Sequence, residues 1–195
     1  MKRIAIFASG NGSNFEALAT ACLDGRITAE VAVMICDKPS AGVIARAERL
    51  SIPTLVLSPR DYDSKAEYEA LIVERLLSEN VSLVCLAGYM RIVGSTLLGA
   101  FEGRIINVHP SLLPAFKGAR AIEQALEYGV KLFGVTIHFV SEELDSGGII
   151  DQVAFRYEGG DLEELETLVH GVEHPLYVSC VQRLVIADIN PSSQT

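Results

Sequence analysis

Apolar runs alternate with amphipathic segments through the first half of this chain, and that alternation constrains its fold more than any other feature. Residues 4–8 form a continuous apolar run, and residues 31–36, 54–57 and 81–87 are also mostly apolar. Runs of this kind are typical of strands that are covered on both faces. Apolar residues at helical spacing separate them, after residue 14, over residues 43–50 and after Ser64. The alternation predicts a parallel sheet with helices on both sides.

Helix-capping residues support these boundaries. Gly25 follows the first amphipathic segment and is a typical C-terminal stop. Ser64 and Glu67 form a capping-box pattern ahead of a periodic apolar stretch. Asp161 and Glu164 repeat that pattern near the end of the chain. We therefore expect helices to begin after Ser64 and after Asp161.

The second half of the chain changes character. Strands are expected over residues 104–109, 135–140 and 149–155, with a helix over 121–128, and the last two strands can form an antiparallel pair. Gly171 and Pro175 should interrupt the final helix, because proline removes a backbone donor and clashes with the preceding turn. Residues 190–195 are polar and should fray. The expected fold class is α/β: one doubly wound, mostly parallel sheet with helices on both faces and an antiparallel C-terminal extension, in a single domain over residues 1–195.

The charge balance excludes several kinds of partner. The chain has 16 basic and 25 acidic residues, a formal net charge of −9 and no basic run. Nucleic acid and anionic membranes are bound through clustered Lys and Arg, so we expect neither as a partner. The apolar run near the N-terminus is too short for a signal peptide, and no stretch approaches the roughly 18 apolar residues of a membrane span. We expect a cytoplasmic protein that acts on small molecules.

Metal binding is not expected either. The four cysteines, Cys22, Cys36, Cys85 and Cys180, lie far apart in apolar contexts, which favours buried free thiols. The chain has no paired His or Cys spacing and no clustered carboxylates, so we predict no metal. His138 alternates with apolar neighbours in a strand and His170 lies in a helix, and we interpret both as structural.

A glycine-rich loop, residues 10–14, connects the first strand to the first helix. Glycines let the backbone turn tightly, and the free amides and dipole at a helix start favour an anion. A third glycine of the dinucleotide pattern would stand at Phe15, and the Walker lysine is absent, so a single phosphate monoester suits the loop better. The alternative is a tight turn in which Ser13 caps the helix.

Two polar residues share one face of the strand that ends at Pro110. Asn107 and His109 alternate with Ile106 and Val108, which should face the core. Ligands of open α/β sheets gather at the carboxyl ends of strands. An amide beside an imidazole supplies two hydrogen-bond donors for an oxyanion, one of which can carry charge or move a proton. The alternative is a strand-end histidine bonded to the backbone.

Two further segments complete the set of candidates. The acidic loop over residues 141–148 contains Asp145 followed by Ser146 and two glycines, which could fold it inward against His109. A carboxylate there would hold the histidine charged and oriented. The apolar segment over residues 88–93 follows a strand on the same edge and suits a slot for a flat heterocycle. A solvated loop and ordinary packing at a helix start are the respective alternatives.

These motifs together resemble the phosphoribosylglycinamide formyltransferases, folate-dependent enzymes of purine synthesis. The resemblance rests on Gly-Asn-Gly-Ser-Asn at 10–14, Leu-Ala-Gly-Tyr-Met-Arg at 86–91, Asn-Val-His-Pro-Ser-Leu-Leu-Pro at 107–114 and Glu-Leu-Asp-Ser-Gly-Gly at 143–148. It extends over about residues 4–184, with matching order and spacing. The third motif is shared by several formyltetrahydrofolate enzymes, whereas the phosphate loop and the chain length narrow the resemblance to this family.

The resemblance implies a reaction and a set of roles. The formyl group of 10-formyltetrahydrofolate would pass to the amine of glycinamide ribonucleotide by direct attack, and the enzyme would be a monomer or homodimer without a metal. The implied catalytic residues are Asn107, His109 and Asp145. The ribonucleotide would contact Gly12, Ser13, Asn14 and, at the expected helix break, Glu173. The folate would contact Lys65, Met90, Arg91, Ile92, Val93, Asn107, Ser141, Glu142, Glu143, Leu144 and Asp145. Arg120 stands where many relatives carry histidine, and Lys65 where some carry arginine, so a proton-shuttling role at 120 is in doubt.

Three other functions are weighed against this one. Methionyl-tRNA formyltransferases share the central motif but need a further C-terminal domain and a basic surface, and formyltetrahydrofolate deformylases need a further N-terminal domain. A catalytically silent nucleotide-binding module could use the same phosphate loop. Pure binding would not require Asn107, His109 and Asp145 together, so we expect the transferase.

Overall fold

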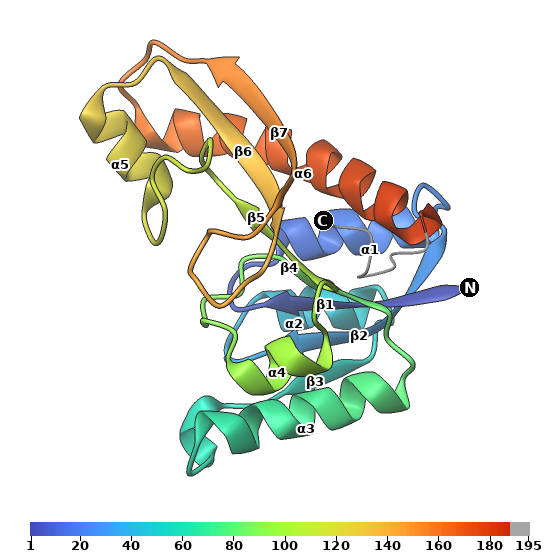
Figure 1. Cartoon of the computed structure of the whole chain (residues 1–195). Helices are drawn as coiled ribbons and strands as arrows, with labels where there is room; N and C mark the ends of the chain where they lie inside the picture. The colour runs from blue at the N-terminus through green and yellow to red at the C-terminus, as the bar shows by residue number, and fades with distance from the viewer. Residues whose placement is uncertain (188–195) are drawn as a thin grey trace.

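The computed structural model describes residues 1–187 and contains one seven-stranded sheet with the order β3-β2-β1-β4-β5-β6-β7 (Figure 1). The strands are β1 (Lys2–Ala8), β2 (Ala29–Cys36), β3 (Thr54–Val56), β4 (Leu83–Leu86), β5 (Ile105–His109), β6 (Leu132–Phe139) and β7 (Ile149–Arg156). Strands β1 to β5 pair in parallel, whereas β6 pairs antiparallel with β5 and β7 antiparallel with β6. The predicted fold class is confirmed. The predicted tail over residues 190–195 lies outside the described residues.

Helices cover both faces of the sheet. They are α1 (Ser13–Leu23), α2 (Val43–Arg49), α3 (Lys65–Ser78), α4 (Ser95–Ala100), α5 (Ala121–Tyr128) and α6 (Leu162–Ile186), with a 3-10 turn over Pro59–Asp61. Side chains of α1, α2, α5 and α6 join one core cluster, and those of α3 and α4 join the other. Figure 1 shows α3 and α4 on one side of the sheet and α1 and α6 on the other. Successive residues of β1, such as Ile6 and Phe7, belong to opposite clusters, as strand geometry requires.

The predicted helix caps are present. The Ser64 hydroxyl accepts a hydrogen bond from the Glu67 amide at 3.1 Å, and the Asp161 carboxylate accepts one from the Glu164 amide at 2.7 Å. Gly25 adopts φ 82° just beyond α1, a conformation that glycine tolerates best. The short α4 and the 3-10 turn were not predicted, because elements of one or two turns carry little periodicity.

The predicted interruption of the last helix is wrong. Helix α6 runs without a break through Gly171 and Pro175. Buried side chains on both sides of the proline, including Val169 and Tyr177, keep both halves packed on the sheet. The Tyr177 hydroxyl also donates to the Leu86 carbonyl at 2.9 Å. This packing outweighs the roughly 3 kcal/mol that an internal proline costs.

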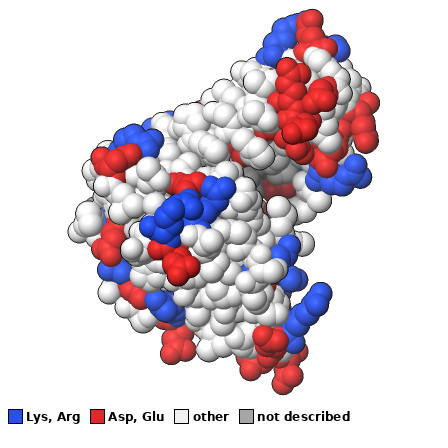
Figure 2. All heavy atoms as spheres, turned by 180° about the vertical axis from the view of Figure 1, so that it is seen from behind, with Lys and Arg blue, Asp and Glu red and all other residues white. Residues whose placement is uncertain are grey.

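The surface and the cysteines agree with the expectations from composition. On the face shown in Figure 2, basic side chains lie among acidic ones and form no continuous patch. No helix within residues 1–187 is long and apolar enough to cross a membrane. Cys36, Cys85 and Cys180 are buried free thiols, and Cys22 is half-buried.

Candidate functional site

Strand register lines up the candidate segments along one edge of the sheet. Phe7 of β1 pairs with Leu86 of β4, and Leu86 pairs with Asn107 of β5. The segments that follow these strands, residues 9–14 and 88–92, therefore lie side by side next to the end of β5. The Ser9 hydroxyl accepts a hydrogen bond from the Met90 amide at 2.9 Å, which joins the first two segments directly. This edge includes the point where the strand order reverses, the usual ligand position in open α/β folds.

The glycine-rich loop lies close against the start of α2. Gly12 has φ 81° and precedes the first residue of α1. A Cβ atom there would stand 2.6 Å from Val43 Cβ, so no larger residue fits. The Arg46 guanidinium donates to Asn11 Oδ1 at 3.2 Å and also pairs with Glu16. The loop is thus held by backbone packing, and Arg46 brings positive charge to it.

Asn14 and Glu173 meet across the helix pair α1 and α6. Asn14 Nδ2 donates to Glu173 Oε2 at 2.9 Å, and both side chains are buried. Burial raises the pKa of Glu173, and the bond from Asn14 opposes that shift. Asn14 Oδ1 is buried and has no hydrogen-bond partner within residues 1–187. Glu173 points inward because it continues the buried face of an unbroken helix, and not because the helix is interrupted.

A hollow of about 550 Å³ lies between α1 and α6 and reaches Ser13 at the phosphate loop. Arg26 and Arg46 line its wall together with Glu16, which pairs with Arg46. His174 also lines it, and its buried Nε2 has no partner in the described part of the chain. Burial lowers the pKa of His174, and the nearby His170 lowers it further. The hollow combines hydrogen-bonding groups and positive charge beside the predicted phosphate site.

The three residues singled out at the end of the sheet lie together. Asp145 Oδ2 is 3.4 Å from His109 Nδ1, and both side chains are buried. The other ring nitrogen, Nε2, donates to the Phe116 carbonyl oxygen at 2.8 Å. Asn107 lies on the same strand face as His109, one alternation earlier, while Ile106 and Val108 face the core. Asp145 adopts φ 50°, so the acidic loop does turn inward.

A fourth residue, His138, belongs to this group. It lies directly opposite Asn107 in the β5–β6 ladder, with its Nε2 3.2 Å from Asn107 Nδ2. The same Nε2 is 3.6 Å from Asp145 Oδ1. Burial lowers the pKa of His138, and the neighbouring Asp145 acts in the opposite direction. His138 was interpreted from the sequence as structural, and the structure places it against Asn107 and Asp145.

Hydrogen bonds connect the loop over residues 110–120 to the acidic loop beside His109. The Gly118 amide donates to Asp145 Oδ2 at 2.8 Å, and Lys117 Nζ donates to Ser146 Oγ at 2.6 Å. Phe116, which precedes both residues in the same loop, supplies the carbonyl that faces His109. Three bonds thus fix the carboxylate and the imidazole relative to each other.

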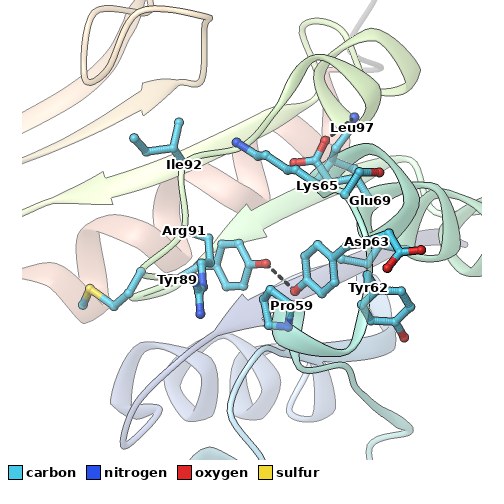
Figure 3. Close-up of a pocket in the computed structure, with 13 residues that line it drawn as sticks. Pro59, Tyr62, Asp63, Lys65, Glu69, Tyr89, Arg91, Ile92 and Leu97 are labelled. Atoms are coloured by element: carbon cyan, nitrogen blue, oxygen red, sulfur yellow. Dashed lines mark hydrogen bonds between the residues drawn. The ribbon is translucent and has the colours of Figure 1, made fainter.

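A cavity of about 470 Å³ lies beside the segment 88–92 (Figure 3). Its wall includes the predicted folate residues Lys65, Met90, Arg91 and Ile92. Met90 and Ile92 are 74% and 63% exposed, so both offer apolar surface at the cavity. Arg91 Nε donates to the buried Asp37 carboxylate at 2.8 Å, which fixes the guanidinium at the rim. The volume and the apolar part of the wall suit a flat ligand, and the charged part combines Lys65 and Arg91 with the carboxylates of Asp63 and Glu69.

Several predicted residues lie elsewhere. The Val93 side chain is buried in the core cluster beneath the cavity and does not line it. The side chains of residues 141–144 are exposed, and Ser141 Oγ donates to the Glu143 carbonyl within their own loop. Arg120 pairs with Glu123 and Glu127 of its own helix and is largely exposed. Contacts of Val93 and of residues 141–144 with a folate stay predictions.

Sequence reasoning missed the residues that act through distant neighbours. His138, His174 and Arg46 carry no motif, and each reaches the site through the pairing of elements far apart in the chain. A signal did exist for His138, because its strand was expected to be antiparallel and polar residues are rare in buried strands. Its register against β5 was not available from the sequence.

Comparisons with known proteins identify the family of this chain. Residues 2–181 match the family model described as Formyl transferase. The chain is 48% identical over 186 residues to the phosphoribosylglycinamide formyltransferase of Bacillus subtilis (strain 168), with 95% of each protein covered. The solved structure of phosphoribosylglycinamide formyltransferase from Bacillus halodurans matches with a TM-score of 0.92 at 49% identity, over 99% of this chain and 100% of that one. Glycinamide ribonucleotide transformylase 1 from Symbiobacterium toebii matches with a TM-score of 0.93 at 43% identity, over 96% of this chain and 89% of that one. The resemblance found in the motifs is confirmed, and the chain belongs to the formyl transferase family.

Proposed function

We propose that this chain transfers the formyl group of 10-formyltetrahydrofolate to the amine of glycinamide ribonucleotide, a step of purine synthesis. The contact that carries the proposal joins His109 to Asp145, with Nδ1 and Oδ2 3.4 Å apart, beside Asn107. Neither a phosphate-binding module nor a purely structural strand end requires a buried carboxylate against a buried histidine. The names of the similar proteins support the same reaction.

The ribonucleotide would bind along the first part of the sheet edge. The backbone amides at Gly12, Ser13 and Asn14 start a helix and suit the phosphate. Arg46 adds positive charge through its contact with Asn11. Glu173 lies next to Asn14 and would receive the glycinamide amine. Burial raises the pKa of Glu173, and a carboxyl group with a raised pKa can both bind an amine and exchange a proton with it.

The folate would occupy the cavity beside residues 88–92, with its formyl group toward the end of β5. Met90 and Ile92 offer exposed apolar surface to a flat ring, and Lys65 and Arg91 offer charge to its carboxylate tail. The order of segments along the edge supports this arrangement, since 88–92 lies between the phosphate loop and β5. Both ligands are small molecules, and the enzyme would act in the cytoplasm as a monomer or homodimer.

In the reaction, the amine attacks the formyl carbon directly and no covalent enzyme intermediate forms. Asn107 Nδ2 and the His109 imidazolium donate hydrogen bonds to the developing oxyanion, each worth about 3–4 kcal/mol. The bond from carbon to folate N10 then breaks, the amine loses a proton and N10 gains one. Asp145 faces the ring, orients it and, with water, relays that proton.

One contact of His109 must change during the reaction. His109 Nδ1 faces Asp145, so Nε2 is the nitrogen left for the formyl oxygen, and it is bonded to the Phe116 carbonyl. The formyl oxygen would take the place of this carbonyl as acceptor. The Phe116 carbonyl thus marks where the oxyanion forms.

The test follows the absorbance of 10-formyl-5,8-dideazafolate mixed with the protein, with and without glycinamide ribonucleotide. Loss of the formyl group only when the ribonucleotide is present is the expected result. Loss without it means hydrolysis and would replace the transferase by a deformylase. No reaction, together with retained binding of the ribonucleotide, would leave the silent nucleotide-binding module.

A further inference from the structure

His138 lies inside the site, yet the proposed reaction assigns it no step. Its side chain is 2% exposed on β6, opposite Asn107 of β5. Its ring Nδ1 is 2.8 Å from the Phe139 carbonyl oxygen, and Nε2 is 3.2 Å from Asn107 Nδ2. Both ring nitrogens therefore have a hydrogen-bond partner, a carbonyl oxygen at Nδ1 and an amide nitrogen at Nε2.

The chemistry of those partners fixes where the hydrogens lie. A carbonyl oxygen can only accept, so His138 Nδ1 carries a hydrogen. In a neutral ring Nε2 is then a lone pair and accepts from the Asn107 amide. Asn107 Nδ2 has two hydrogens, so one binds His138 and the other points elsewhere. If the Asn107 amide were turned over, its oxygen would face the lone pair of His138 Nε2, and the two would repel each other.

We infer that His138 is a positioning residue: its neutral Nδ1–H tautomer holds the Asn107 amide with the nitrogen, and not the oxygen, available to the oxyanion. The inference rests on the proposed function for its effect on rate, but the tautomer itself does not. It explains why a polar, buried strand residue stands opposite Asn107. His138 would not touch the reacting atoms.

The groups around the ring bear on its charge. Asp145 Oδ1 lies 3.6 Å from Nε2 and favours the charged ring, whereas His109 opposes it. Asn107 and the Phe139 carbonyl are uncharged. Burial is the largest influence and lowers the pKa of His138, which favours the neutral ring, while the hydrogen bond to the Phe139 carbonyl raises that pKa. A proton on Nε2 would turn it into a donor, reverse the preference of Asn107 and remove one oxyanion donor.

The tautomer is measured directly by NMR of the ring nitrogens in protein labelled at its four histidines, without any substrate. The His138 signals are identified by their loss in His138→Gln. We expect a hydrogen on Nδ1 and none on Nε2 at pH 7. A hydrogen on Nε2, or a charged ring at that pH, would overturn the inference whether or not the protein catalyses transfer.

Kinetics test the action through Asn107. His138→Leu removes the hydrogen-bond acceptor of Asn107. It should lower kcat by about 10-fold to 10²-fold, since the upper bound is the loss expected for one oxyanion donor. KM for the ribonucleotide should be nearly unchanged. His138→Gln offers an uncharged acceptor near Nε2 and should restore most of that loss. In an Asn107→Ala background, His138→Leu should cost less than about twofold, since coupled residues are not additive.

The opposite results are equally clear. If His138→Leu costs the same in both backgrounds, or if His138→Gln is as impaired as His138→Leu, the positioning role is wrong. Circular dichroism of each variant shows whether it folds, and the NMR result on the unaltered protein stands if the leucine variant does not. Absence of transfer by the unaltered protein would refute the proposed function instead and leave the tautomer measurement to decide the inference.

Discussion

The two ends of the ligand-binding edge are built in different ways. At the phosphate loop, the chain is positioned by its own backbone: Gly12 adopts φ 81° and fits against Val43, with no space for a side chain. At the end of β5, position is set by side chains from separate segments, since Asp145 is held by the Gly118 amide and faces both His109 and His138. The first region should therefore be sensitive to added atoms and the second to altered polar groups.

The largest expected effect is on turnover at the side-chain end. Asp145→Asn or His109→Asn should lower kcat by about 10²–10³-fold or more, because the oxyanion loses charge-assisted donation. KM for the ribonucleotide should change little, since the phosphate loop is intact. Steady-state kinetics and a thermal melt provide the measurement. Glu102→Gln, an exposed carboxylate at the far end of β5, is the control for loss of charge. Near-normal turnover in either site variant would end the assignment of these residues.

The backbone end is tested by adding one carbon. Gly12→Ala should raise KM for the ribonucleotide at least about tenfold and destabilise the fold by about 1–3 kcal/mol, because φ is positive and Val43 occupies the space. Urea unfolding and substrate saturation measure the two effects. Gly10→Ala is the matched control, since no atom lies within 4 Å of its added carbon and its φ is not positive. Equal stability losses in both variants would contradict the contrast between the two ends.

A smaller effect is expected at the cavity between the two ends. Lys65→Met should raise KM for a folate with a charged glutamate tail about threefold to tenfold and leave kcat within twofold, because a partly solvated ion pair contributes little. The measurement compares analogues with and without the glutamate, in low and high salt. The same increase for both analogues would mean that Lys65 acts on the cavity shape and not on the tail.

The smallest effect concerns stability and pH at the Asn14–Glu173 contact. The pKa of Glu173 is raised in the folded protein, so the folded state binds more protons than the unfolded state above the ordinary Glu value. Stability contributed by the protonated form is therefore lost as pH rises toward neutral. Glu173→Gln keeps a polar partner for Asn14 without the charge, so it should gain stability relative to the unaltered protein at pH 7 but not at pH 4. Urea unfolding at both pH values measures this. A relative loss at pH 7 would show that the charge stabilises the fold.

The sequence predicted the parts of the fold that depend on neighbours in the chain. Periodicity located the strands and helices of the first half, and capping residues located the starts of α3 and α6. It was wrong at Pro175, where a local rule against helix continuation is outweighed by packing on both sides. The short helix α4 was not predicted, because its six residues carry too little periodicity.

The candidate site shows the same distinction between what adjacent residues determine and what tertiary packing determines. Strand alternation alone determined that Asn107 and His109 share a face, and the glycine-rich loop alone determined a helix start open to an anion, because both depend on adjacent residues. The contact of Asp145 with His109, the pairing of Asn14 with Glu173 and the place of His138 opposite Asn107 were decided only by the tertiary structure. The physical reason is that strand register and helix pairing join residues far apart in the chain, and these are fixed by the burial of the whole core.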